Sequence, residues 1–120
     1  MPQSLAQVYL HLVFSTKNRT PFVEDHVHLL VRFGRTVTIA NLIKELKRTS
    51  SIWIKDEFGI NAFEWQSGYG AFSISPAHLQ ILVKYIKNQE EHHKKVSFQD
   101  EFRRLLKKYQ IEYDERYVWD

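Results

Sequence analysis

Two stretches near the N-terminus have the residue pattern of β-strands. Residues 5–16, LAQVYLHLVFST, are rich in Val, Leu, Tyr and Phe, which favours a mostly buried strand. Residues 24–33, EDHVHLLVRF, predict a second strand that ends before Gly34. Successive side chains of a strand point to opposite faces. One face of the first strand therefore carries Tyr9, His11 and Val13, and one face of the second carries His26, His28 and Leu30.

Three later segments repeat apolar residues at helical spacing. The first helix is predicted to begin after Thr38, a suitable N-cap, and to end near Lys55. The second begins at Ser75, which is followed by Pro at the first helical position, and ends near Lys94. The third covers residues 97–110, with Ser at its N-cap.

A third strand is predicted over residues 65–75, WQSGYGAFSIS. Gly68 and Gly70 within it imply a bulge, or the close approach of another backbone or a ligand. The aromatic tail, residues 111–120, is expected to dock on the rest of the chain. The order strand, strand, helix, strand, helix, helix predicts one α+β domain over residues 1–120, with a mainly antiparallel sheet.

Composition narrows the function classes only modestly. The 120 residues carry a net charge of +3 and no cysteine, which excludes disulfides and cysteine-based zinc sites. The mild positive charge suits a partner such as nucleic acid but also suits many enzymes. The longest apolar runs are too short to cross a bilayer, no signal peptide is recognised, and a cytoplasmic protein is expected.

His26 and His28 are the first candidate for chemistry. Two residues apart on a strand, they point to the same face with Cα atoms about 6.5–7 Å apart. Imidazole is the commonest metal-binding side chain, so the pair could hold one ion. The alternative is a half-buried strand whose polar face happens to carry histidine. His11 could point to the same face or be a satisfied core histidine, and we favour the second interpretation.

Tyr85 and Gln89 are four residues apart on the second predicted helix, so they share one face. Tyr85 lies beside the apolar stripe, and the simplest interpretation is a tyrosine at the edge of the core. Tyr69, between the two glycines, could stack on an unpaired base. Candidate phosphate contacts are the basic residues Lys17, Arg19, Lys44, Lys47, Arg48, Lys84 and Lys87.

Five segments in order resemble the single-tyrosine HUH transposases, which include small insertion-sequence transposases and the REP-associated tyrosine transposases. The segments are YLHLVFSTKNR, DHVHLL, LIKELKRTSSIWI, WQSGYGAFSIS, and YIKNQEEHH leading to SFQDEF. They span nearly the whole chain, and His26-Val27-His28 matches the His-hydrophobic-His motif that names the family.

This resemblance implies a ferredoxin-like α+β fold with helices on one face of the sheet, and a homodimer. It implies cleavage and rejoining of single-stranded DNA at hairpin-marked ends of a mobile element. Tyr85 would be the nucleophile and form a 5′-phosphotyrosine. His26, His28 and Gln89 would bind Mg²⁺ or Mn²⁺, and the active site could be shared between the two subunits. A nucleoid-associated, cytoplasmic protein is the expectation.

One segment departs from the family. Relatives of this type carry a helix and a further strand between the first strand and the HUH strand, whereas here Asn18 to Glu24 separate them. A parallel crossover needs at least ~10–12 residues, so the first crossover is predicted to be missing or shortened. The chain could form a direct hairpin instead, or borrow the element from a partner. The alternative function is an inactive remnant that binds nucleic-acid hairpins without cutting them.

Overall fold

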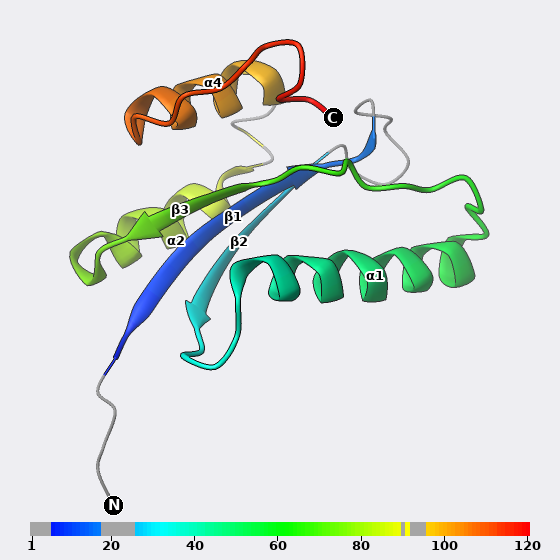
Figure 1. The fold of residues 1–120 in the computed structure, drawn as a ribbon, viewed down its shortest axis with the longest axis horizontal. Helices are drawn as coiled ribbons and strands as arrows, with labels where there is room; N and C mark the ends of the chain where they lie inside the picture. The colour runs from blue at the N-terminus through cyan, green and yellow to red at the C-terminus, as the bar shows by residue number, and fades with distance from the viewer. Residues whose placement is uncertain (1–5, 18–25, 90, 92–95) are drawn as a thin grey trace, which may run out of the picture.

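The computed structural model describes residues 6–17, 26–89, 91 and 96–120. Within them the chain forms one three-stranded sheet with helices around it (Figure 1). None of the helices in these residues is long and apolar enough to cross a membrane. The elements are β1 (Val8–Ser15), β2 (His26–Phe33), α1 (Ile39–Phe58), β3 (Gly70–Ile74), the 3₁₀ helix η2 (Pro76–His78), α2 (Leu79–Lys87) and α4 (Phe98–Lys108).

The sheet has the strand order β2-β1-β3, and both pairings are antiparallel. β1 pairs with β2 along its whole length, from Val8 opposite Phe33 to Ser15 opposite His26. The predicted α+β class and antiparallel sheet are therefore confirmed. The short connection between the two strands falls largely outside the described residues. The register nevertheless shows that β2 returns directly alongside β1, as in the hairpin alternative.

Helices cover both faces of the sheet. On one face, Leu10 and Leu12 of β1 pack with Ile43 of α1. On the other face, Val13 and Phe72 pack with side chains of α4, and α2 lies on this second face as well (Figure 1). The prediction of helices on one face was wrong in this detail. Because β1 is buried on both sides, each of its faces needs a covering layer.

Local capping explains where the helices begin. The Thr38 side chain accepts a hydrogen bond from the backbone N–H of Asn41, and Ser97 does the same for Asp100, as predicted. α1 ends at Gly59, which has a left-handed φ of 64°. α2 ends at Lys87, whereas the predicted helix ended near Lys94. Residues 92–94 of that predicted helix lie outside the described part of the chain.

The two glycines of the third strand segment allow close approach, one of the alternatives considered for them. The N–H of Gly68 donates to the backbone oxygen of Asp120 at 2.8 Å. A Cβ at Gly70 would lie 2.9 Å from Cζ of Phe102. The C-terminal tail therefore docks against the segment that precedes β3, with Trp119 packed against the core cluster that includes Phe98 and Phe102 of α4. β3 itself is limited to Gly70–Ile74, shorter than predicted.

Candidate active site

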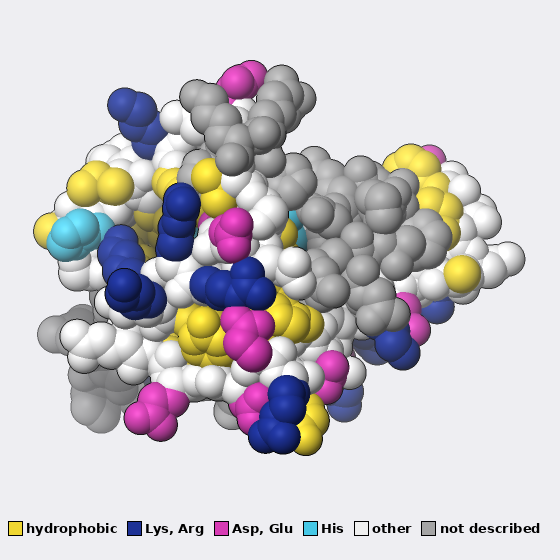
Figure 2. Space-filling model, turned by 90° about the horizontal axis from the view of Figure 1, so that it is seen from above, with side chains coloured by type: hydrophobic (Ala, Val, Ile, Leu, Met, Phe, Trp, Pro, Cys, Tyr) yellow, Lys and Arg dark blue, Asp and Glu magenta, His cyan; other side chains and the backbone are white. Residues whose placement is uncertain are grey.

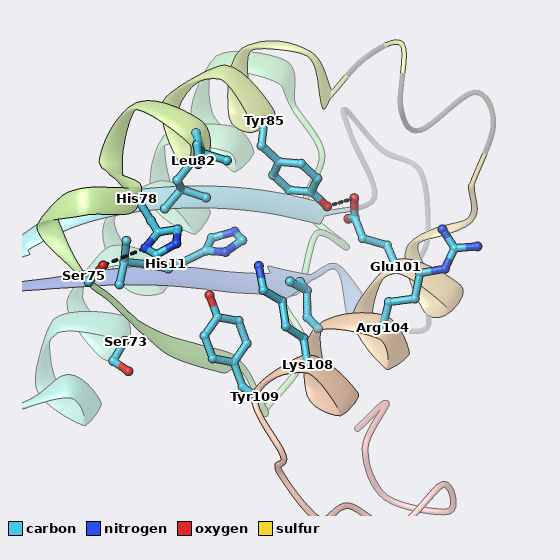
Figure 3. Close-up of a pocket in the computed structure, with 13 residues that line it drawn as sticks. His11, Ser73, Ser75, His78, Leu82, Tyr85, Glu101, Arg104, Lys108 and Tyr109 are labelled. Atoms are coloured by element: carbon cyan, nitrogen blue, oxygen red, sulfur yellow. Dashed lines mark hydrogen bonds between the residues drawn. The ribbon is translucent and has the colours of Figure 1, made fainter.

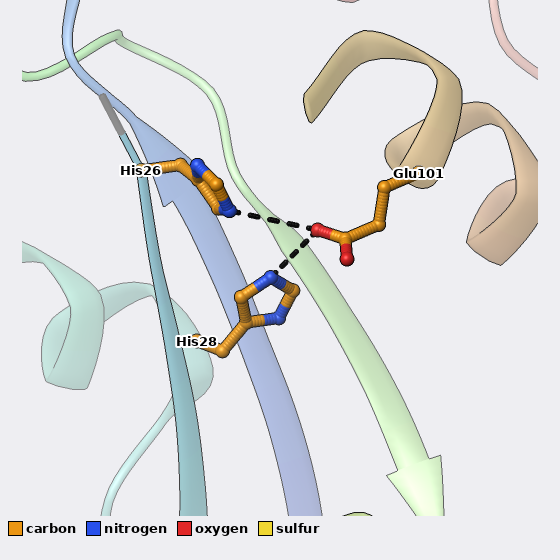
Figure 4. Close-up of side chains that lie close together, drawn as sticks. All are labelled: His26, His28 and Glu101. Atoms are coloured by element: carbon orange, nitrogen blue, oxygen red, sulfur yellow. Dashed lines mark hydrogen bonds and ion pairs between the residues drawn. The ribbon is translucent and has the colours of Figure 1, made fainter. Parts of the chain in front are cut away.

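The two histidines of the HUH motif converge on one carboxylate. His26 and His28 project from β2 toward Glu101 in the first turn of α4 (Figure 4). His28 Nε2 lies 2.8 Å and His26 Nε2 3.6 Å from Glu101 Oε1. Glu101 is only 3% exposed. A fully buried carboxylate is rare without partners, and both imidazoles supply them here.

His11 supports this cluster from the neighbouring strand. It is 1% exposed, and its Nε2 lies 2.8 Å from Nδ1 of His28. His28 pairs with Val13 across the β1–β2 ladder, so His11 and His28 share a sheet face. The expectation of a satisfied core histidine is met in part, because the partner that satisfies His11 is the HUH motif itself.

Tyr85 and Gln89 reach the same carboxylate from α2. The Tyr85 hydroxyl donates to Glu101 Oε2 at 2.5 Å, and Gln89 Nε2 donates to that oxygen at 3.3 Å. The ring centroid of Tyr85 lies 5.7 Å from that of His28. Their four-residue spacing thus places both side chains at the site, and within one chain. Gln89 Oε1 is buried and has no hydrogen-bond partner among the described residues, so a further donor or a cation could bind to it.

The close packing of these groups shifts the pKa values of Glu101, Tyr85 and His11. Burial alone would raise the pKa of Glu101, but hydrogen bonds from His26, His28 and Tyr85 outweigh it and hold the pKa well below its usual range. Burial, reinforced by the hydrogen bond to Glu101, raises the pKa of the Tyr85 phenol well above its usual range. Burial also lowers the pKa of His11 to about 4. At neutral pH the site therefore holds an anionic Glu101, a protonated phenol and a neutral His11.

The donor set fits a divalent metal ion. One ligand atom each from His26, His28 and Glu101 lies within 4.8 Å of the others. Two imidazole nitrogens and a carboxylate oxygen form a common ligand set for divalent transition metals. His11 hydrogen-bonds the ring nitrogen of His28 that faces away from Glu101, as outer partners of metal-binding histidines usually do.

Sequence reasoning missed Glu101. It lies 73 residues beyond His28, in a helix that was interpreted only through its cap and apolar stripe. One signal was available: Glu101 stands between Phe98 and Phe102, next to the predicted buried stripe of that helix. A carboxylate at the edge of an apolar stripe requires a partner, but the pattern does not show where that partner lies.

The predicted phosphate-binding residues do not form one surface. Lys44, Lys47 and Arg48 lie on α1, whereas Lys84 and Lys87 lie on α2, on the other face of the sheet (Figure 1). Arg19 lies outside the described residues.

Several of these cations have partners within the chain. Lys47 Nζ donates to three backbone carbonyls, those of Gln66, Ser67 and Gly68, at 2.8, 3.3 and 2.8 Å. Burial lowers the pKa of Lys47 to about 8. Arg48 pairs with Glu45 at 2.9 Å, and Lys17 lies 3.6 Å from Glu64. Tyr69 is 42% exposed, which leaves its ring accessible for stacking.

Comparison with known protein families decides the family. The model of a family described as "Transposase IS200 like" matches residues 21–89, more than half of the chain. The chain belongs to the IS200-like transposases. The match includes the HUH motif, Tyr85 and Gln89, and it ends before Glu101 and α4. No curated protein and no solved structure matches the chain. Membership of the IS200-like transposases confirms the predicted resemblance and implies a protein that binds DNA.

Proposed function

We propose that this chain is a metal-dependent transposase that cleaves and rejoins single-stranded DNA through Tyr85. One observation carries the proposal: a nucleophile and a set of metal donors from three separate elements meet at one buried carboxylate. Tyr85 comes from α2, His26 and His28 from β2, and Glu101 from α4. Tyr85 is half-buried beside the two imidazoles, and transesterification uses such a pairing of a nucleophile with a metal site.

The proposed step transfers phosphorus from a DNA oxygen to the tyrosine. Tyr85 Oη forms a bond to the scissile phosphorus while the bond from phosphorus to the 3′ oxygen breaks. The phenol loses its proton and the departing 3′ oxygen gains one, so the step leaves a 5′-phosphotyrosine and a free 3′-hydroxyl. Attack by a second 3′-hydroxyl reverses the reaction on another strand, and no nucleotide cofactor is needed.

The chain's own groups hold the reactants in position. Glu101 orients the Tyr85 hydroxyl by accepting its hydrogen bond. His28 can offer its Nε2 lone pair only when its proton is on Nδ1, where His11 Nε2 is available as an acceptor. His26, His28 and Glu101 would hold the ion, with Gln89 Oε1 as the further ligand that the family resemblance implies. A bound Mg²⁺ or Mn²⁺ would polarise the scissile phosphate and favour charge on the attacking oxygen.

The proposed substrate is single-stranded DNA marked by hairpins, and the proposed assembly is a homodimer. In the structure, the Tyr85 hydroxyl reaches the histidine cluster through Glu101 of its own chain. This supports an active site that each subunit completes with its own helix, so a dimer would serve to hold two DNA ends rather than to assemble one site.

A covalent-adduct assay tests the proposal. The wild-type protein and a Tyr85→Phe variant are incubated with labelled hairpin-bearing single strands in Mn²⁺, then separated on a denaturing gel. We expect a protein–DNA adduct with the wild type, none with Tyr85→Phe, and none with the wild type in EDTA. A gel shift should show unchanged hairpin binding by the variant. An adduct of equal yield with Tyr85→Phe would rule out Tyr85 as the nucleophile.

A second candidate function is the binding of nucleic-acid hairpins without cleavage. It is favoured by the direct antiparallel pairing of β1 and β2, where the family resemblance implies a longer crossover with its own helix and strand. The same assay separates the two functions. Hairpin binding by the wild type with no adduct in either Mg²⁺ or Mn²⁺ would support the binding module.

A further inference from the structure

A cavity of about 600 Å³ lies between α2 and α4 and opens beside Tyr85. Its walls come from the end of β3, from η2 and α2, and from the later turns of α4, as Figure 3 shows. His11, Tyr85 and Glu101 also line the cavity, and the Tyr85 hydroxyl donates a hydrogen bond to Glu101 there (Figure 3). The volume is that of a small-molecule site.

Two cations on α4, Arg104 and Lys108, line this cavity. Arg104 and Lys108 are exposed and one helical turn apart, and neither forms an ion pair with any described residue. The adjacent Arg103 differs, because it pairs with Glu115 at 2.6 Å and Asp100 at 3.0 Å. Figure 2, which views the molecule from the α4 side, shows Lys and Arg side chains next to hydrophobic ones. Cations at the rim of a cavity that form no ion pair with the described carboxylates favour an anionic ligand.

The remaining walls favour a ligand with a flat, partly apolar body. Ile81, Leu82 and Leu105 provide apolar surface, and the ring of Tyr109 lies beside Lys108. Ser75 Oγ and His78 Nδ1, 2.7 Å apart, add polar groups at the η2 end. A free phosphate would use only the two cations, whereas a nucleotide would use the cations for its phosphate and the apolar walls for its base.

We infer that this cavity binds one unpaired nucleotide, the one that adjoins the phosphate attacked at Tyr85. The inference rests on the proposed function, because only the phosphodiester chemistry places a DNA strand at the Tyr85 hydroxyl. Arg104 and Lys108 contact the nucleotide's phosphate, and the base enters between Leu82 and Tyr109. The cavity then selects the nucleotide beside the cleavage point, separately from any contact with a hairpin.

Nucleotide binding to the intact chain tests this inference without any cleavage. The methyl resonances of Ile81 and Leu82 are followed by NMR during titration with each of the four deoxynucleoside monophosphates, with deoxyribose 5-phosphate and with inorganic phosphate. We expect saturable shifts with at least one nucleotide and much weaker ones with the two base-free probes. The double variant Arg104→Gln/Lys108→Gln should raise the dissociation constant at least about tenfold.

Lys107→Gln is the matched control, because it removes a charge from an exposed position of the same helix that does not line the cavity. It should leave the dissociation constant within about twofold of the wild type. Unfolding midpoints confirm that the variants fold. Absent shifts with all four nucleotides, equal shifts with inorganic phosphate, or equal binding by the double variant would overturn the inference.

The nucleotide-binding and covalent-adduct experiments together distinguish failure of this inference from failure of the proposed function. Nucleotide binding without any covalent adduct from the wild type would contradict the proposed cleavage and leave the cavity assignment standing. An adduct from the wild type without nucleotide binding would do the reverse.

Discussion

The two faces of the sheet are both buried, but they are built from different chemistry. Toward α1, β1 presents Leu10 and Leu12, which pack on Ile43 in an apolar layer. Toward α2 and α4, the same strand presents His11, which meets His28 and, through it, Glu101. Burial of polar groups is unfavourable unless each finds a partner. The apolar face therefore serves stability, whereas the polar face retains groups that a stable core does not need.

The largest expected effect is a loss of stability when a buried side chain on the apolar face is shortened. Leu12 is 0% exposed, and Leu12→Ala removes buried methyl groups and leaves a cavity under α1. We expect the free energy of unfolding to fall by about 2–5 kcal/mol, measured by urea denaturation. Metal affinity, measured by calorimetry under conditions where the variant is folded, should stay near the wild-type value. A large loss of metal affinity would show that the two faces are not independent.

The polar face should make the stability of the protein depend on pH. His11 has a pKa of about 4 in the folded protein, below its ordinary value of 6.5, so between these values the unfolded chain binds a proton that the folded chain does not. Stability should therefore fall as the pH drops from 6.5 to 4. The loss for wild type should exceed that for His11→Leu by roughly 3 kcal/mol, measured by denaturation in EDTA at each pH.

Glu101 contributes to acid sensitivity in both proteins of that comparison. Its pKa is lowered in the folded state, so its contribution to stability is present above the unfolded value of about 4.5 and is lost as the pH falls below it. The informative quantity is the difference between the two proteins above pH 4.5. Parallel curves for wild type and His11→Leu in that window would contradict the buried, neutral state of His11.

The sequence predicted the parts of the fold that depend on local pattern. Strand alternation placed His26 and His28 on one face, and the caps at Thr38 and Ser97 were found from their side-chain chemistry. Helical spacing placed Tyr85 and Gln89 together. These features follow from interactions within a few residues, which the chain order reveals directly.

The features that the sequence did not reveal depend on packing between distant segments. Glu101 lies at the site because α4 packs on the same face of the sheet as α2. The spacing of apolar residues within each helix does not show that the two helices pack on one face. The sequence also did not show that the Lys47 ammonium donates to the carbonyls of Gln66, Ser67 and Gly68, and its contact with phosphate stays a prediction. Whether a cationic side chain faces solvent or a backbone carbonyl depends on the path of the neighbouring loop. The spacing of charged residues along the chain does not predict that path.

The central claim is that one chain carries both the nucleophile and the metal donors of its own active site. The direct test mixes two inactive variants, Tyr85→Phe and His26→Ala/His28→Ala, and measures the covalent adduct with hairpin-bearing single strands in Mn²⁺. Each site completed within its own chain has lost either the tyrosine or the histidines. The structure therefore predicts no adduct from the mixture, while the wild type forms it. Adduct formation by the mixture would contradict the claim, because it would require Tyr85 of one chain to act with the histidines of another.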